Sequence, residues 1–150
     1  MRLVIGADHA GFALKEKLRK QLQAAGHEIV DVGAYEYNRD DDYPDFAAAV
    51  GRAVVAGEGE RGILVCGSGV GACIAANKID GVRCVVCSQP YSAALSRAHN
   101  DTNVLSMGAR VVGTDLAKMI VKAWLEGEYE GGRHARRVEQ IAQLEGGASL

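Results

Sequence analysis

A thiol stands directly before a glycine-rich turn in the middle of the chain. The turn comprises Gly67, Ser68, Gly69, Val70 and Gly71. Glycines that alternate with small residues let the backbone approach a ligand closely, so several N–H groups can stabilise one oxyanion. A thiolate can act as a base, and a nearby helix N-terminus favours it over the neutral thiol, so Cys66 is a candidate for proton abstraction. Ser68 could relay a proton between two oxygens of the ligand. The alternative for Cys66 is an inert, buried structural thiol, and the alternative for Ser68 is a hydroxyl that only fills a tight turn.

The same turn has to be compared with nucleotide-binding loops. Residues 67–72 satisfy the permissive G-x-G-x-x-G/A pattern, but the acidic residue expected about 20 positions later is missing, because residues 86–89 are uncharged. A Walker A loop is excluded, since Ala72 and Cys73 stand where that loop needs Gly and Lys. Dinucleotide binding is therefore only a weak alternative.

Histidine and arginine residues elsewhere in the chain could complete a site for a phosphorylated compound. Imidazole exchanges protons readily at neutral pH, so His99 is a candidate acid/base, although a residue at a helix end could equally be a cap. Arg133 and Arg137 are four residues apart, which puts both guanidinium groups on one helix face, where they can bind a phosphate. His9 and Arg110 could join this cluster. The alternative is a solvated charged helix.

Short apolar segments alternate with amphipathic segments along the whole chain. Strands are expected at residues 2–6, 28–32, 63–66, 82–87 and 103–107. This alternation predicts an α/β sandwich with a mostly parallel sheet and right-handed crossovers. Ligands of such folds bind at the carboxyl ends of the strands, where the sequence places Asp8 and His9, residues 66–68, and also Ser88 and Gln89.

Helices are expected between and after these strands. In the first helix, Leu14, Leu18 and Leu22 recur at helical spacing and predict a buried stripe, while Lys15 and its charged neighbours fill the other face. Residues 99–102 are expected to form a polar turn before the fifth strand. The last helix, at about residues 133–145, follows two glycines.

Length and composition limit the possible functions. A chain of 150 residues is expected to form one domain, residues 1–150. The net charge of −2 gives no general attraction to nucleic acid or to an anionic membrane, and no apolar run is long enough to span a bilayer. We expect a cytoplasmic protein without a signal peptide. Cys84 and Cys87 match the C-x-x-C spacing, but side chains three apart in a strand point to opposite faces and cannot chelate one ion.

Six sequence motifs, in order and nearly end to end, carry a family resemblance. They are GADHAGF at 6–12, DYP at 42–44, CGSGVG at 66–71, AANK at 75–78, HNDTNV at 99–104 and GGRHARRV at 131–138. Together they resemble ribose-5-phosphate isomerase type B, a family that also includes the galactose-6-phosphate isomerase subunits. The resemblance implies a Rossmann-like three-layer sandwich with a five-stranded sheet. It also implies interconversion of ribose 5-phosphate and ribulose 5-phosphate in the pentose phosphate pathway, without a metal or organic cofactor.

The resemblance also implies roles for further residues. Asp8 and Asn100 would hold sugar hydroxyls, and Tyr43 would line the pocket. The phosphate-binding cluster would in part reach across a homodimer, with the C-terminal helix contributing to the dimer, and a higher assembly is left open. His134 could belong to the partner's site. Some relatives carry a Glu in the turn, where this chain has Ala72.

Two other functions stay open at this point. The first is isomerisation of a hexose 6-phosphate such as allose or galactose 6-phosphate, because pocket length cannot be read from the sequence. Having Cys66 and His99 in one chain favours an enzyme that needs no second kind of subunit. The other is a non-catalytic sensor of nucleotides or sugar phosphates built on the same sheet.

Overall fold

A parallel sheet forms the centre of the molecule in the computed structural model, which describes residues 1–149. All four strand pairs are parallel, and the strand order is β2-β1-β3-β5-β4. This confirms the expected α/β fold with its five-stranded sheet. The strands are β1 (Arg2–Ala7), β2 (Glu28–Asp31), β3 (Arg61–Cys66), β4 (Cys84–Val86) and β5 (Val104–Gly108).

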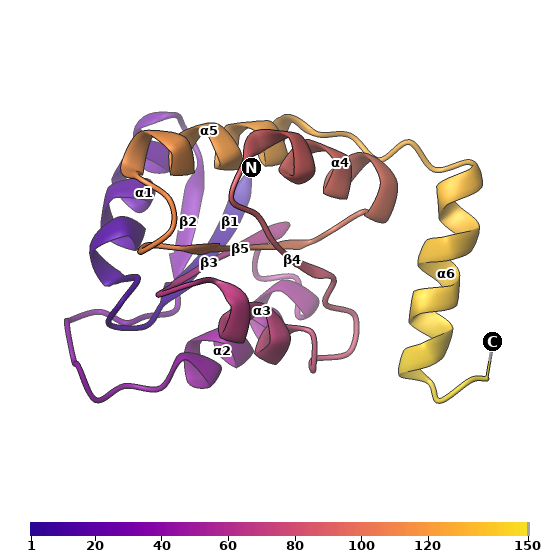
Figure 1. Cartoon of the computed structure of the whole chain (residues 1–150), viewed down its shortest axis with the longest axis horizontal. Coiled ribbons are helices and arrows are strands. Elements are labelled where there is room, and N and C mark those ends of the chain that lie inside the picture. Colours follow the sequence, from indigo (N-terminus) through magenta and orange to yellow (C-terminus); the bar gives the residue numbers. More distant parts are fainter. Residues whose placement is uncertain (150) are drawn as a thin grey trace.

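Five of the six described helices cover the two faces of the sheet (Figure 1). One face carries α1 (Phe12–Ala24), α4 (Pro90–Asn100) and α5 (Thr114–Glu126), and the other carries α2 (Tyr43–Val55) and α3 (Val70–Ala76). The sixth, α6 (Arg133–Glu145), stands away from these layers, and a short segment follows it toward the C-terminus. None of the described helices is long and apolar enough to cross a membrane.

The sheet is buried on both faces, which explains why its strands read as continuous apolar runs. Along β3, Ile63 faces the helices α1, α4 and α5, whereas Leu64 faces α2 and α3, and both side chains are almost fully buried. Burying each such side chain stabilises the fold by about 1.5–3 kcal/mol. Cys87 packs on the first face and Cys84 against the second, as the sequence predicted, so these thiols do not converge on one ion.

The polar-turn prediction for residues 99–102 was wrong in part. α4 continues to Asn100, so His99 and Asn100 lie in its last turn rather than in a loop. Asp101 then adopts a left-handed conformation with φ of 47°, and its N–H bonds back to Arg97 O at 3.2 Å. Asp tolerates this backbone conformation better than most residues, so the helix ends here and β5 follows.

Candidate active site

A cavity of about 310 Å³ opens at the carboxyl edge of the sheet. Asp8 and His9 follow β1, Cys66 ends β3, and Arg110 follows β5, so three adjacent parallel strands deliver these side chains to one place. The two other predicted residues at this edge, Ser88 and Gln89, do not line the cavity. The lining residues are Asp8, His9, Ala10, Tyr43, Cys66, Gly67, Ser68, Gly71, Arg110 and Val111.

Cys66 is buried, and its sulfur lies within the glycine-rich loop. The N–H of Gly69 donates to Cys66 Sγ at 3.1 Å, and the N–H of Val70 donates to Ser68 Oγ at 3.3 Å. Gly69 and Val70 therefore support the loop rather than line the cavity. Among the described residues, the N–H groups of Gly67, Ser68 and Gly71 have no protein acceptor and can bind a ligand oxyanion.

Two glycines of this loop are required by close packing. Gly69 has φ of 83°, and a Cβ there would lie 2.8 Å from the carbonyl carbon of Met107. Only glycine adopts such a conformation at low cost. A Cβ at position 71 would lie 2.5 Å from Cζ of Tyr43, so the tyrosine ring packs directly on the Gly71 backbone. The loop thus presents bare backbone to the cavity, with Tyr43 on one side.

Asp8 both stabilises a turn and lines the cavity. Its Oδ1 accepts a hydrogen bond from Gly11 N at 3.0 Å, which fixes the turn between β1 and α1, and the same residue lines the cavity. His9 is held by Asp41, which accepts from His9 N at 3.0 Å and from His9 Nδ1 at 2.6 Å. Asp41 was not a predicted site residue, because it is one of three consecutive aspartates in a polar loop and no sequence pattern distinguishes it from the other two.

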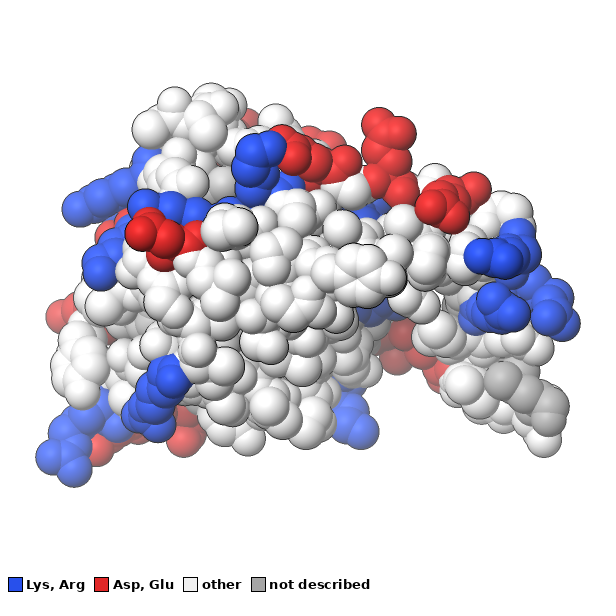
Figure 2. Space-filling model, turned by 45° about the horizontal axis from the view of Figure 1, so that its top comes forward, with Lys and Arg blue, Asp and Glu red and all other residues white. Residues whose placement is uncertain are grey.

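A second group of predicted residues lies around the start of α6. The ring of His99, at the end of α4, stacks on that of His134 with a centroid distance of 4.2 Å. Arg133 donates from Nε to His134 Nε2 at 3.4 Å, and Arg137 is exposed one turn further along. Figure 2 shows the blue basic side chains that α6 gathers at one end of the molecule. Burial is the main cause that lowers the pKa of His134, and His99 and Arg133 add to it.

Within one chain, these two groups lie at opposite ends of the parallel strands. Cys66 pairs with Gly108 at the end of β5, whereas His99 ends the helix that leads into the start of β5 at Val104. Five residues of parallel strand span about 13 Å, so the side chains cannot meet. Accordingly His99, Asn100, Arg133 and Arg137 do not line the cavity that holds Cys66. Within one chain the predicted site residues therefore form two separate groups, which we call the half-sites.

Each half-site also contains three side chains of metal-ligating type within 4.8 Å of one another. The first is Asp8, His9 and Asp41, and the second is His99, Glu130 and His134. In the first, the His9 Nδ1 atom is already bonded to Asp41. In the second, the guanidinium of Arg133 lies against His134 and would repel a cation. Neither arrangement favours a bound metal ion over the internal contacts.

Comparison with known proteins identifies the relatives of this chain. The Ribose/Galactose Isomerase family model matches residues 3–141. Ribose-5-phosphate isomerase B of Escherichia coli is 56% identical over 144 residues, 96% of each chain, and D-erythrulose-4-phosphate isomerase of Pectobacterium atrosepticum is 41% identical over 97% of this chain and 95% of its own.

Solved structures give the same result. The Clostridium thermocellum ribose-5-phosphate isomerase B has a TM-score of 0.96 at 48% identity, covering 99% of this chain and 100% of its own. The Mycoplasma genitalium enzyme with bound ribulose-5-phosphate has a TM-score of 0.93 at 38% identity, covering 98% and 97%. A family match over most of the chain, joined to the same fold and to a thiol beside a glycine-rich loop, shows that the chain belongs to the ribose/galactose isomerase family.

Proposed function

We propose that this protein is an aldose–ketose isomerase that interconverts ribose 5-phosphate and ribulose 5-phosphate. The observation that carries the proposal is the sulfur of Cys66, 3.1 Å from Gly69 N, at the wall of a cavity lined by loop N–H groups. That combination places a base next to a set of oxyanion-binding N–H groups, so both can act on one sugar bound in the cavity. The structure with ribulose-5-phosphate from Mycoplasma genitalium supports the choice of substrate.

The residues present can perform each proton transfer. In ring opening, His99 removes the proton of the C1 hydroxyl as the C1–O4 bond breaks, and the same imidazole returns that proton to O4. The Cys66 thiolate then removes the C2 proton of the open aldose, and the electron pair moves onto O1 to give an enediolate. The N–H groups of Gly67, Ser68 and Gly71 stabilise its charge, and losing one such donor costs about 3 kcal/mol. Ser68 passes a proton between O1 and O2, and Cys66 returns its proton to C1.

The acid/base group for ring opening comes from a second copy of the chain. His99 and Asn100 lie at the far edge of the sheet from Cys66, so a complete site needs Cys66 from one protomer and His99 of the partner subunit. Arg133 and Arg137 of the partner subunit would then meet His9 and Arg110 around the phosphate. A symmetric dimer contains this exchange twice, which gives two complete sites.

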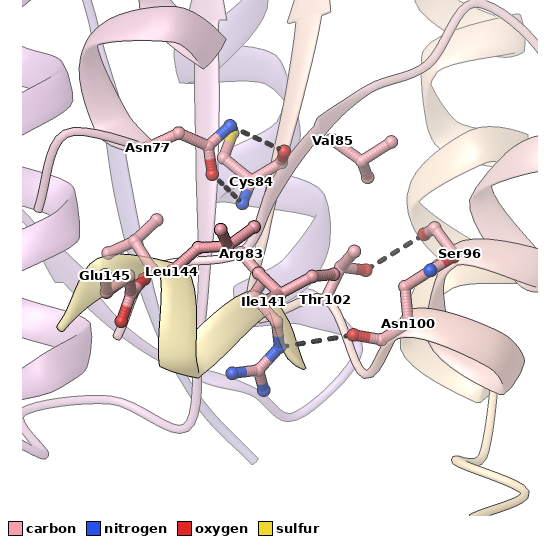
Figure 3. A pocket seen from close by; sticks show the side chains of 11 residues that line it. Asn77, Arg83, Cys84, Val85, Ser96, Asn100, Thr102, Ile141, Leu144 and Glu145 are labelled. Atoms are coloured by element: carbon pink, nitrogen blue, oxygen red, sulfur yellow. Dashed lines mark hydrogen bonds between the residues drawn. The ribbon is translucent and has the colours of Figure 1, made fainter. Parts of the chain in front are cut away.

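The surface of the chain supports such a dimer. α6 stands away from the sheet and, with the open edge strand β4, borders a groove of about 530 Å³ (Figure 3). Ile141 and Leu144 of α6 line it together with Val82 and Val85, and the two α6 side chains are 41% and 53% exposed. We propose that a second copy of the chain covers these apolar side chains, because the separation of Cys66 from His99 already calls for one.

Members of the family differ in the length of the sugar phosphate that they accept, so the number of carbons in the substrate has to be considered separately. The cavity of about 310 Å³ is small for a dinucleotide and fits a single sugar phosphate with the partner's residues closing it, which argues against dinucleotide binding. A relative named D-erythrulose-4-phosphate isomerase adds a four-carbon candidate to the hexose phosphates considered from the sequence. The cytoplasmic location expected from the sequence stays a prediction.

Turnover tests the proposal directly. Purified protein in buffer with a chelator is expected to convert ribose 5-phosphate to ribulose 5-phosphate, with a higher kcat/KM than for allose 6-phosphate, galactose 6-phosphate or erythrulose 4-phosphate. A higher kcat/KM on one of the other sugars would reassign the substrate. Thermal stabilisation by nucleotides, with no turnover of any sugar phosphate, would favour the sensor.

A further inference from the structure

Asp41 contacts His9 across 32 positions of sequence. The residue lies in the loop between β2 and α2, and its Oδ1 accepts two hydrogen bonds, from His9 N at 3.0 Å and from His9 Nδ1 at 2.6 Å. The Asp41 side chain is 10% exposed and the His9 side chain 27%. A bond of this length between an imidazole and a carboxylate is charge-assisted and among the stronger kinds in proteins.

The carboxylate of Asp41 serves no second partner. Its other oxygen, Oδ2, is buried and has no hydrogen-bond partner among the described residues. A buried carboxylate oxygen without a donor costs stability, so Asp41 is a poor residue for holding the loop together. Its side-chain hydrogen bonds both go to His9, and its contribution is therefore directed at that residue.

The contact fixes both the position and the tautomer of the His9 ring. Because Asp41 occupies Nδ1 as an acceptor, the hydrogen sits on Nδ1 and Nε2 is the ring nitrogen left for the cavity that His9 lines with Arg110. Tyr37 meets the His9 ring edge to face at a centroid distance of 6.2 Å. The ring is thus held on two sides while one nitrogen stays available.

We propose that Asp41 is a positioning residue for substrate binding, which holds His9 so that its Nε2 atom meets the phosphate of the bound sugar. The inference rests on the proposed function for the identity of the ligand. Asp41 touches no reacting atom, and its effect passes through His9. Nε2 donates to the phosphate dianion in the doubly protonated ring, since a neutral ring with its hydrogen on Nδ1 presents only a lone pair at Nε2.

Steady-state kinetics on ribose 5-phosphate tests the proposal. Asp41→Ala is expected to raise KM roughly tenfold with kcat within about twofold, because a charge-assisted bond that orients a binding group acts on ground state and transition state alike. Asp41→Asn, which keeps an acceptor oxygen but no charge, is expected to fall between wild type and Ala. The matched control is Asp40→Asn, one residue away with a side chain 82% exposed, and it is expected to leave both constants unchanged.

A double-mutant cycle separates positioning from general damage. In a His9→Asn background, Asp41→Ala is expected to add nothing to the rise in KM, since the residue it positions is already gone. The melting temperature of Asp41→Ala is expected to stay close to that of wild type, because the truncation loses the bonds to His9 but also removes a buried oxygen that has no donor. Additive effects in the cycle, or an unchanged KM in Asp41→Ala, would overturn the proposal.

Imidazole nitrogen NMR provides a readout that needs no turnover. The chain has four histidines, so His9 can be assigned from the spectrum of His9→Asn. Wild type is expected to show the neutral His9 ring protonated at Nδ1, and inorganic phosphate is expected to shift Nε2 with weaker apparent affinity in Asp41→Ala. If wild type turned over no sugar phosphate but showed these signals, the proposed function would fail and the positioning role would stand. An Nε2-protonated neutral ring would refute the positioning role in either case.

Discussion

The imidazole rings of His99 and His134 lie face to face, with centroids 4.2 Å apart and an angle of 8° between their planes. His99 is in the last turn of α4 and His134 in the first turn of α6, so the stack ties the protruding helix to the body. It also fixes the ring that the proposed mechanism uses for opening the sugar. Whatever moves this stack therefore affects both the attachment of α6 and the chemistry.

Acid is expected to weaken this attachment. Burial, followed by His99 and Arg133, lowers the pKa of His134 from 6.5, and Glu130 only partly opposes them. The unfolded chain therefore takes up a proton at higher pH than the folded chain. The resulting stability is complete above about pH 6.5 and decreases as the pH falls through the lowered pKa. Melting temperatures between about pH 7.5 and pH 5 should reveal the loss.

His134→Phe serves as the comparison for this titration. Phenylalanine keeps a planar ring against His99 but binds no proton. The melting temperature of the variant is expected to fall less than that of wild type over the same pH range. Parallel falls in the two proteins would show that His134 is not the group responsible.

Cys66→Ala is expected to abolish proton abstraction while leaving the binding pocket intact. General-base catalysis contributes about 10²–10⁴-fold, so kcat should fall by roughly a thousandfold with little change in KM. Exchange of the C2 proton of the sugar for solvent deuterium, followed by NMR, measures the step itself. Cys73→Ala is the control, because Cys73 has a lowered pKa from its contact with Cys84 yet lies outside the cavity. Full turnover in Cys66→Ala would remove Cys66 from the mechanism.

The sequence predicted the five-stranded sheet, and several of the residues selected from it line one cavity, because both follow from local patterns. Apolar runs specify buried parallel strands, and strand ends specify the edge at which ligands bind. Residues such as Cys66 and Asp8 were thus found from their places at strand ends. The partners of these residues were harder to find, since Asp41 reaches His9 only through the folding of a long loop.

Lys15 shows where helical periodicity fails. The pattern placed it on the solvent face of α1, but the side chain is fully buried, with Nζ 2.9 Å from both carboxylate oxygens of Asp31 and 2.6 Å from Ala34 O. A lysine becomes tolerable in the interior when a carboxylate and a carbonyl replace its water. Those acceptors come from residues 16 and 19 positions away, so no local pattern contains them. The separation of His99 from Cys66 also depends on how distant segments fold together, so no local sequence pattern could have predicted it.

Gly71→Ala is expected to damage binding by displacing Tyr43. The new Cβ would lie 2.5 Å from Tyr43 Cζ, and because that ring is 42% exposed it can swing away at little cost in stability. We expect kcat/KM to fall by roughly tenfold or more while the melting temperature stays near that of wild type. Against a Tyr43→Ala background, Gly71→Ala should have almost no further effect. A full additional loss there would mean that the Gly71 backbone acts independently of Tyr43.

The sharpest expectation concerns which chain supplies each half-site. Cys66→Ala and His99→Asn should each be nearly inactive alone, because every site in a homodimer lacks one group. Refolded together in equal amounts, they form mixed dimers in which one site carries both defects and the other carries none. Random pairing makes half of the dimers mixed, so activity should recover to about a quarter of wild type.

Two controls make this recovery decisive. Mixing Cys66→Ala with Ser68→Ala, whose side chains lie in the same cavity, should restore nothing, because every mixed dimer then has one defect in each site. Refolding each variant separately and combining them afterwards tests how slowly subunits exchange. If Cys66→Ala and His99→Asn failed to complement after joint refolding, His99 would have to reach Cys66 within one chain, against the length of β5 that separates them.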